Sequence, residues 1–434
     1  MSAPPSRRAV LLPLAGLACL APAALSAPVL SAQVLAPPGS AIPVFRRGIG
    51  VSHAMGWAEV ADDGSYAEPP FSGPRFRFDG PQRRAIRTAG FDFVRLAVDV
   101  GPFLAADAAR RARIDRRLVE TVEALLDDGL GVVVDLHPSD MHPAYTPTAL
   151  TAGATAPAFL AYLGLVTRTA ASLAALVARR RPVSAPRLAF ELMNEPEMSQ
   201  AAWQPMLEAA YQAARQGSTT LPLVLGGGEQ NAAASLDALD IRPFADDPAV
   251  LYTFHSYEPW QFTHQGVQGN PAYPFDAVPY PAPAGSPAME RATALRIAGL
   301  PSDALRAAGG AAAAGDALRR YSRSGFDRAA LDAIFRRVSA WRQAQKLPAH
   351  AILLGEFGAH LTPYQRTDEG AAARTRWLHD MRNLAEEHGF AWAAWTYVGS
   401  GGFALANSEI GPGFDPATAD ALGLAASGAN PTRP

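Results

Sequence analysis

Two glutamates stand at the ends of short apolar segments, where they could act together as an acid and a nucleophile. Glu195 closes the segment FELMNE, and Glu356 closes ILLGE. A facing pair of carboxyl groups can cleave a glycosidic bond, because a protonated one donates to the leaving oxygen while the other attacks or activates water. The alternative is a pair of solvated glutamates, or one glutamate paired with Arg95. The residues that accompany the pair decide between these interpretations.

Other polar and aromatic side chains share this position at the end of an apolar segment. Arg95 closes FDFVR, His137 closes VVVDLH, and His255 and Tyr257 close YTFHSY. Trp395 lies in WAAWTY. Each has a structural explanation of its own, such as a buried histidine with a hydrogen-bond partner or a ring in the core. The same pattern on six segments is much harder to attribute to coincidence, so we expect these side chains to meet.

From Arg47 onward, short apolar segments alternate with longer amphipathic ones. We predict strands at residues 47–52, 91–98, 131–136, 188–193, 223–226, 250–255, 352–356 and 391–397. We predict helices at residues 82–89, 113–126, 158–180, 201–215, 235–239, 328–346 and 371–388. Eight strands separated by helices indicate an α/β fold, the (β/α)8 TIM barrel, which carries catalytic groups at the C-terminal ends of its strands. No strand precedes a Gly-x-Gly-x-x-Gly turn, which argues against a dinucleotide-binding fold, and we interpret GGGEQ at 226–230 as a tight turn.

One connection is much longer than the others. Residues 258–325 follow the sixth predicted strand and are rich in proline, alanine and aromatic residues. A segment of this length at the C-terminal end of a barrel strand lies at the active-site face, where long loops are usually functional. Residues 287–320 could form helices of their own. We therefore predict a single catalytic domain, residues 47–428, that carries 258–325 as an active-site loop insertion.

Four motifs in their order along the chain resemble a known family. They are DLHP at 135–138, MNEP at 193–196, HSYEP at 255–259 and GEFG at 355–358. Together they look like glycoside hydrolase family 5, the cellulase family within the clan of (β/α)8 retaining glycosidases, and the resemblance runs from about Arg47 to Tyr397. It implies a retaining mechanism with Glu195 as acid/base and Glu356 as nucleophile. Retention further implies carboxyl groups roughly 5 Å apart.

The resemblance also implies roles for the neighbours of the two glutamates. Asn194 would hydrogen-bond the sugar 2-hydroxyl, and Arg95 would hold Glu356 in its ionised form by charge and hydrogen bonding. His137 would bind the sugar beside the cleavage point, above Trp395 as the stacking floor. Further residues expected to line the site are His255, Tyr257, His53, Trp57 and Trp260. Trp57 could instead pack in the core. The aromatic side chains of the insertion could either bind sugar or only anchor the insertion: Trp260, Phe262, His264, Tyr273 and Tyr280.

These inferences predict a hydrolase that acts on a β-linked polysaccharide or oligosaccharide. An endo-β-1,4-glucanase is the first expectation. An exo-β-glucanase, a β-mannanase, a β-1,3-glucanase or an exopolysaccharide hydrolase of the same fold stay open, because the insertion could wall off one end of a groove. A metal-dependent barrel hydrolase is a remote alternative, raised by the side chains in DLHPSDMH: Asp135, His137, Asp140 and His142. A sugar-binding barrel without catalysis is another. We expect no cofactor and no metal, since strand one has no His-x-His.

The N-terminus predicts export. Arg7 and Arg8 precede an apolar run, and small residues around Ala27 and Ala32 offer cleavage sites, so residues 1–32 read as a signal peptide. The Ser-Arg-Arg start resembles a twin-arginine signal. An Ala/Pro-rich leader then covers 33–46. Cys19, the only cysteine, lies in the signal, and a lipid on it is disfavoured by Gly16, where a large apolar residue is usual.

Composition narrows the class of partner. The 434 residues are 49% hydrophobic and 18% charged, with a formal net charge of -2. That balance suits a globular protein and provides no electrostatic footprint for nucleic acid or an anionic membrane. We therefore expect a secreted or periplasmic monomer that binds no nucleic acid, and no membrane once the signal is removed.

Overall fold

The computed structural model of the protein describes residues 42–180, 187–283, 285–399, 402–406 and 412–424. The predicted signal peptide with Cys19, and the leader up to residue 41, lie outside the described residues. So do residues 425–428, the predicted end of the catalytic domain.

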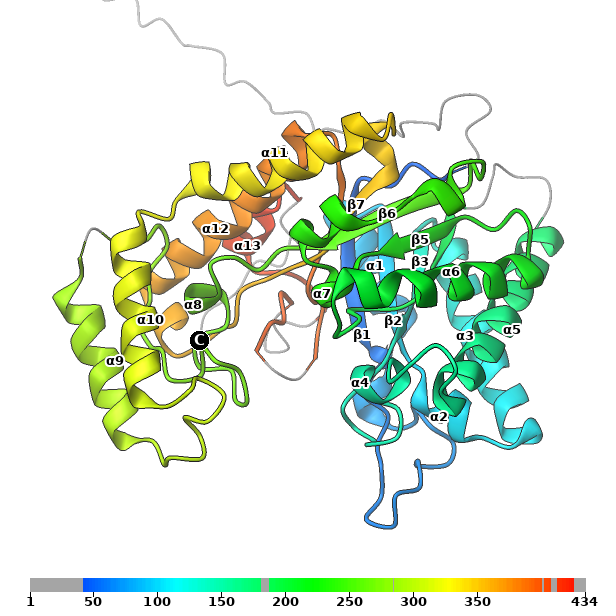
Figure 1. Cartoon of the computed structure of the whole chain (residues 1–434), viewed down its shortest axis with the longest axis horizontal. Helices are drawn as coiled ribbons and strands as arrows, with labels where there is room; N and C mark the ends of the chain where they lie inside the picture. The colour runs from blue at the N-terminus through cyan, green and yellow to red at the C-terminus, as the bar shows by residue number, and fades with distance from the viewer. Residues whose placement is uncertain (1–41, 181–186, 284, 400–401, 407–411, 425–434) are drawn as a thin grey trace, which may run out of the picture. The chain divides into compact units, whose positions relative to one another are not determined.

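Eight parallel strands form a closed barrel in their order along the chain, and the eighth pairs with the first (Figure 1). The strands are β1 (Arg47–Met55), β2 (Phe93–Asp99), β3 (Gly131–His137), β4 (Leu188–Glu191), β5 (Leu223–Gly226), β6 (Val250–His255), β7 (Ile352–Phe357) and β8 (Ala391–Ala394). The predicted (β/α)8 barrel is confirmed. Two strands end earlier than predicted, β4 at Glu191 and β8 at Ala394. The catalytic candidates that follow them therefore lie on the rim and not inside the sheet.

Helices cover the outside of the barrel. The long ones are α1 (Gly80–Ala89), α3 (Ala108–Asp127), α5 (Pro157–Arg179), α6 (Gln200–Gly217), α11 (Arg328–Ala344) and α12 (Asp368–Glu387). Shorter ones are α2 (Gly101–Ala105), α4 (Pro147–Leu150), α7 (Gly228–Asn231) and α13 (Pro416–Ala421). In the described part of the chain, five segments form 3-10 helices: η1 (Pro74–Phe76), η2 (Ala233–Ala238), η3 (Arg242–Phe244), η4 (Ala349–Ala351) and η5 (Tyr364–Arg366). The helix predicted at 235–239 is the 3-10 helix η2.

Helix α3 illustrates how the sequence sets these elements. The Asp107 side chain caps its first turn by accepting a hydrogen bond from Arg110 N. Its buried residues fall at helical spacing, as predicted: Ile114, Leu118, Val122 and Leu125. Gly129 follows with a φ of +78°, a left-handed conformation that glycine adopts without a steric penalty. The chain can therefore turn directly into β3.

The insertion after β6 contains helices of its own. They are α8 (Trp260–Thr263), α9 (Pro287–Gly299) and α10 (Ala311–Ser324), and α9 packs beside α10 (Figure 1). Two of its rings anchor it to α12: Tyr280 donates a hydrogen bond to Asp380 over 2.9 Å, and the ring of Phe262 lies 6.4 Å from that of Trp377. Phe262 and Tyr280 are fully buried, so they hold the insertion in place and do not bind sugar.

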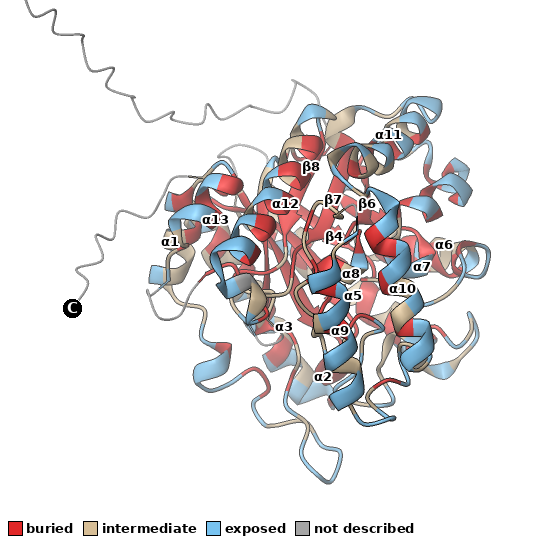
Figure 2. Cartoon of the chain, turned by 90° about the vertical axis from the view of Figure 1, so that its left-hand side faces the viewer, coloured by how far each residue is buried: buried red, intermediate tan, exposed pale blue. Residues whose placement is uncertain are grey.

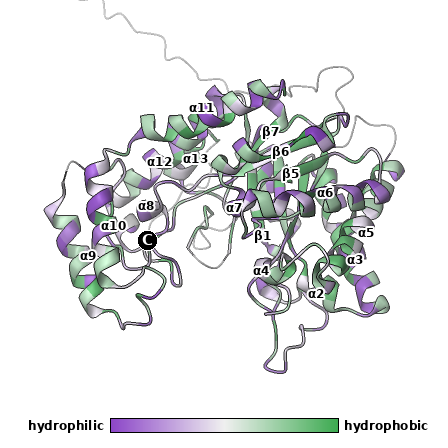
Figure 3. Ribbon diagram, in the orientation of Figure 1, coloured by the Kyte–Doolittle hydropathy of each residue, from purple (hydrophilic) through white to green (hydrophobic). Residues whose placement is uncertain are grey.

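The core has two parts. The larger one lies between the strands and the helices, whose outer faces are exposed (Figure 2). Hydrophobic residues concentrate in β5, β6 and β7, whereas the surrounding helices contain both hydrophobic and hydrophilic residues (Figure 3). The smaller one fills the inside of the barrel at the N-terminal ends of the strands. Ile42 and Phe45 belong to it, and the Phe45 ring lies 4.7 Å from that of Phe93. The predicted leader of 33–46 therefore extends too far, because its last residues belong to the domain.

Among the described residues, one helix, α5, is long and apolar enough by composition to cross a membrane. Its inner face includes Phe159, Tyr162 and Leu173, all fully buried. It contacts α6 most extensively, and also α2, α3 and α4. A core helix of a barrel has this composition because it packs against strands on one side and other helices on its flanks.

The burial of Phe45 generates a first prediction. Phe45→Ala should lower the free energy of unfolding by about 3 to 5 kcal/mol, because it removes a ring from a filled core. Thermal or urea denaturation followed by circular dichroism measures the change. Arg46→Ala, at the exposed neighbour, is the control and should stay within about 0.5 kcal/mol of the wild type. Equal stability of the two variants would mean that residues 42–45 do not belong to the domain.

Candidate active site

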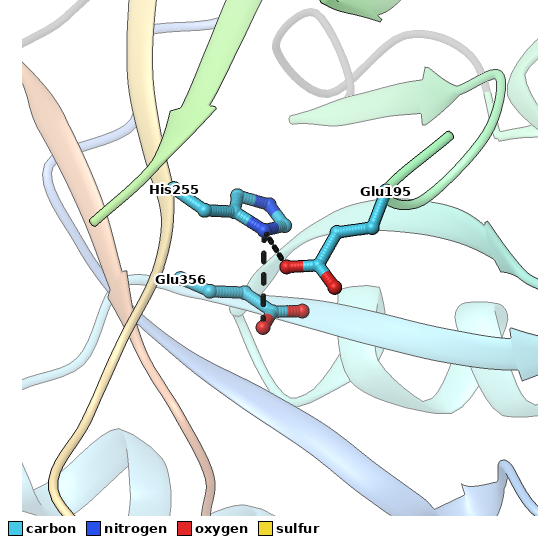
Figure 4. Close-up of side chains that lie close together, drawn as sticks. All are labelled: Glu195, His255 and Glu356. Carbon is cyan, nitrogen blue, oxygen red and sulfur yellow. Dashed lines mark hydrogen bonds and ion pairs between the residues drawn. The ribbon is translucent and has the colours of Figure 1, made fainter. Parts of the chain in front are cut away.

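Three side chains from the ends of β4, β6 and β7 converge at one rim of the barrel (Figure 4). An oxygen of Glu195, a ring nitrogen of His255 and an oxygen of Glu356 all lie within 4.8 Å of one another. His255 Nδ1 is 2.7 Å from Glu195 Oε1 and 3.9 Å from Glu356 Oε2. The spacing agrees with the roughly 5 Å expected for retaining glycosidases, and it is far below the 6.5–9.5 Å of inverting ones.

Glu356 is buried and accepts two strong hydrogen bonds. Arg95 Nη1 donates to Oε1 over 2.6 Å, and the Tyr257 hydroxyl donates to Oε2 over 2.7 Å. Charge-assisted hydrogen bonds of this kind favour the carboxylate form of the acceptor. Both oxygens are therefore held in a fixed direction by hydrogen-bond donors, as an attacking carboxylate requires.

Arg95 is fully buried and serves two further carboxylates. Its guanidinium donates to both oxygens of Glu191, over 2.7 and 2.8 Å, and lies 3.1 Å from Asp135. It also donates to Asn194 Oδ1 over 2.8 Å. Burial raises the pKa of Glu191 to about 7, and the charge of Arg95 limits the rise. Sequence reasoning missed Glu191 as a site residue, although a carboxylate inside the buried segment FEL was a usable signal.

His137 lies between a carboxylate and an amide. Its Nδ1 is 2.7 Å from Asp135 Oδ2, and its Nε2 is 3.3 Å from Asn194 Nδ2. Burial lowers the pKa of His137, but the charge and hydrogen bond of Asp135, together with the charge of Glu356, outweigh burial and raise that pKa above its ordinary value. The imidazole stacks on Trp395, with ring centroids 5.6 Å apart and planes at 6°. The ring of Trp57 is 5.1 Å from the same imidazole.

Glu195 has an environment opposite to that of Glu356. Burial raises its pKa to about 7, and the nearby positive groups His137 and Arg95 reduce this rise only in part. Its side chain keeps 27% of its surface exposed, so the carboxyl group reaches the open rim. Burial also lowers the pKa of His255 to about 3, so this imidazole is neutral at physiological pH. Glu195 therefore has a neutral hydrogen-bond partner and can keep a proton.

The other predicted residues lie around this centre at different distances. Trp57 is 6.0 Å from Trp395 by ring centroids, so the two indoles and His137 form one cluster of three rings. Trp260 is 41% exposed, stacks on His264 at 3.9 Å and lies 6.0 Å from the ring of Tyr257.

Two predicted rings are more remote. The His53 ring lies 3.1 Å from the carbonyl oxygen of Arg77 and packs beside Phe78 and Tyr397, away from the two glutamates. Burial lowers its pKa to about 4. Tyr273 packs under the guanidinium of Arg296 at 4.9 Å, a contact within the insertion between α9 and the segment before it.

The metal site considered for DLHPSDMH does not form in the described part of the chain. Asp135 and His137 bind one another, Asp140 is exposed, and His142 stacks on Tyr66 at 5.5 Å. The described residues bring three potential ligands together only at Glu195, His255 and Glu356, where a hydrogen bond already joins two of them.

Comparison with known proteins points to one family. The family model described as Cellulase (glycosyl hydrolase family 5) matches residues 82–401. Endoglucanase 3 of Fibrobacter succinogenes is 25% identical over 244 residues, which are 53% of this chain and 32% of that protein. Cellodextrinase A of Ruminococcus flavefaciens is 28% identical over 190 residues, which are 43% and 54% of the two chains. The chain thus spans between a third and about half of the length of these relatives.

Solved structures share the fold. Endoglucanase Cel5A of Thermotoga maritima superposes with a TM-score of 0.59 at 20% identity, over 87% of this chain and 97% of that one. A family 5 xyloglucanase of Paenibacillus pabuli superposes with a TM-score of 0.57 at 16% identity, over 87% and 98%. In both cases the shared fold covers nearly the whole length of the solved structure.

The raised pKa of Glu195 makes stability depend on pH. A carboxyl group whose pKa rises from 4.5 to about 7 on folding holds its proton more tightly in the folded state, so stability is lost as pH rises through that window. Glu195→Gln is neutral at every pH. The difference between its free energy of unfolding and that of the wild type should therefore shift in favour of the variant as pH rises from 4.5 to 7, by at most about 3 kcal/mol. Urea titrations at several pH values measure the difference, and a constant difference would contradict the raised pKa.

Proposed function

Because the chain belongs to the cellulase family, glycosyl hydrolase family 5, we propose that it hydrolyses β-1,4-linked glucan with retention, as an endo-acting enzyme. One observation carries the mechanism: two carboxyl groups within 4.8 Å have opposite environments. Glu356 accepts hydrogen bonds from an arginine and a tyrosine, whereas the hydrogen-bond partner of Glu195 among the described residues is a neutral histidine. Such a pair separates a nucleophile from an acid.

In the first step, Glu356 attacks the anomeric carbon while Glu195 protonates the leaving oxygen. The bond to the leaving sugar breaks, and a covalent glycosyl-enzyme forms through Glu356. In the second step, Glu195 takes a proton from water, and that water displaces Glu356. Two inversions at the same carbon retain its configuration. As bond formation removes the charge of Glu356, the donors Arg95 and Tyr257 keep its carboxyl group oriented for the return.

The rings at the rim fit a bound sugar. Trp395 and Trp57 lie next to each other and both contact His137, so a pyranose can stack on an indole while its hydroxyls reach the imidazole. Asn194 is held by Arg95 next to Glu195, in place to contact the 2-hydroxyl. Trp260 presents an exposed face near Tyr257. These residues form the proposed binding surface, and His53 lies at its margin.

The names of the relatives favour glucan. Two relatives are called an endoglucanase and a cellodextrinase, and the structure of Thermotoga maritima Cel5A is known in complex with cellobiose. That same enzyme is also known in complex with mannotriose, which makes β-mannan the second candidate. The insertion with α9 and α10 follows β6 directly and so borders one side of the rim. An exo-acting enzyme is the alternative that this wall supports.

We also propose that the protein is exported and acts as a monomer outside the cytoplasm. The arginine pair and apolar run at the N-terminus support export. A polymeric β-glucan is too large to enter a cell, so its hydrolysis suits an exported enzyme.

The nucleophile can be tested directly. Glu356→Gln should lower kcat on a soluble glucan by at least about 10³-fold, because loss of a catalytic group of this kind removes the first step. Its circular dichroism spectrum should stay that of the wild type. Azide should restore turnover for the corresponding alanine variant, Glu356→Ala, with inverted configuration. Near-normal turnover of Glu356→Gln would refute the assignment.

The substrate is identified by a screen with product sizing. Carboxymethyl-cellulose, barley β-glucan, β-mannan and β-1,3-glucan are incubated with the wild type and with Glu356→Gln as the inactive control. We expect hydrolysis of the β-1,4-glucans, with an early fall in viscosity that indicates internal attack. Proton NMR of the first product should show the β-anomer. A steady release of one short product would instead identify an exo-acting enzyme, and an α-anomer would exclude retention.

A further inference from the structure

The turn after β5 has an unusual backbone. Glu229, Gln230 and Asn231, in the helix α7, have φ angles of +54°, +57° and +57°. Three successive non-glycine residues in this left-handed region cost roughly 1 to 2 kcal/mol each, so other contacts must hold the turn. Sequence reasoning expected a tight turn here but had no means to see its handedness.

The contacts that hold this turn lead back to Glu195. Glu229 N donates to Met198 O over 2.7 Å, and Gln230 N donates to Pro196 O over 3.1 Å. Both acceptors lie within three residues of Glu195, which itself has a positive φ of +45°. The turn is thus fastened to the segment that carries the proposed acid.

The left-handed backbone directs Asn231 into the barrel. Its side chain is fully buried, and its Nδ2 lies 3.5 Å from His255 Nε2. Two glycines make room for this pair: a Cβ at Gly226 would lie 2.6 Å from Asn231 Oδ1, and a Cβ at Gly355 would lie 2.9 Å from His255 Nε2. Ala232 also forms a parallel β-bridge with His255, so the two segments are in fixed register.

His137 shows what an amide in this position does. Arginine can only donate hydrogen bonds, so Arg95 fixes Oδ1 of Asn194 toward itself and turns Nδ2 toward His137 Nε2. In the neutral form of His137, Nε2 is then the acceptor, and the imidazole proton sits on Nδ1, facing Asp135. His255 has a similar arrangement, with Nδ1 toward Glu195 and Nε2 toward Nδ2 of Asn231, although the buried Oδ1 of Asn231 has no hydrogen-bond partner among the described residues.

We propose that Asn231 is a positioning residue that sets the tautomer of His255 and thereby keeps the acid proton of Glu195 available to the substrate. The neutral imidazole has one proton. When Asn231 Nδ2 donates to Nε2, that proton is on Nδ1 and is donated to Glu195 Oε1. Oε1 is then an acceptor, so the proton of the carboxylic acid sits on Oε2, free to reach the glycosidic oxygen. In the other tautomer, Nδ1 is the acceptor and takes the hydrogen bond of the acid away from the substrate.

This inference rests on the proposed function, and its test separates the two. Asn231→Asp keeps the size and the left-handed backbone, which aspartate tolerates, but replaces the donor with an acceptor and so favours the proton on Nε2. Asn231→Gly is the second variant in case the buried carboxylate prevents folding. Gln230→Gly is the matched control, because it removes an exposed side chain from the same turn and suits a positive φ.

The kinetic readout is the dependence on the leaving group. Phenyl β-cellobioside needs a proton to leave, whereas 2,4-dinitrophenyl β-cellobioside does not. Both Asn231 variants should lower kcat/KM for the phenyl substrate by about tenfold or more, lower it little for the dinitrophenyl substrate, and shift the alkaline limb of the pH profile. Gln230→Gly should behave as the wild type. An equal loss on both substrates would show a general structural effect and overturn the proposal.

The spectroscopic readout does not depend on activity. In protein labelled with ¹⁵N-histidine, His255→Asn identifies the signals of His255 among the nine histidines. Wild type should show a protonated Nδ1 and an unprotonated Nε2, and Asn231→Asp should show a protonated Nε2. A protonated Nε2 in the wild type would overturn the inference. If the wild type hydrolyses neither cellobioside nor any glucan, the proposed function fails, while this measurement still decides the tautomer.

Discussion

A single buried cation organises the described site. Arg95 comes from β2, and its guanidinium meets carboxylates from β3, β4 and β7: Asp135, Glu191 and Glu356. An unpaired buried charge would cost several kcal/mol, so each partner needs the others. The carboxylates raise the pKa of Arg95 well above its ordinary value even though burial acts to lower it. The positions of these side chains therefore depend on four strands that keep their register in a closed barrel.

The same cation explains why the two central glutamates differ. Glu356 accepts a hydrogen bond from Arg95, whereas Glu195 has no hydrogen bond to it and contacts the neutral His255. Both residues are glutamates, so the difference between them comes from whether the carboxyl group is hydrogen-bonded to the Arg95 guanidinium. The neutral state of His255 adds to this difference. A charged imidazole beside Glu195 would lower the pKa of that carboxyl group.

The fold was predictable because its signals are local. Short apolar segments alternate with longer amphipathic ones, and all eight strands were predicted from this alternation, with a polar or aromatic residue near the end of six of them. Relations between segments were less accessible. The pairing of Glu191 with Arg95 depends on the register of the strands. The left-handed backbone of residues 229–231 depends on contacts with the residues after Glu195. The burial of Ile42 and Phe45 depends on the interior of the barrel, which exists only once the barrel closes. The insertion was recognised by length, but its anchoring by Tyr280 required the position of α12.

The pairing of β1 with β8 has a consequence for synthesis. Arg47 leaves the ribosome early, yet its partner in the sheet is Trp392, near the end of the chain. Until β8 emerges, β1 has one unpaired edge, which is a template for association with other chains. Glu195 and His255 are likewise made before Glu356. A nascent or truncated chain that ends before β7 therefore lacks Glu356, and one that lacks β8 exposes the unpaired edge of β1. Pairing of β8 with β1 closes the barrel and covers that edge.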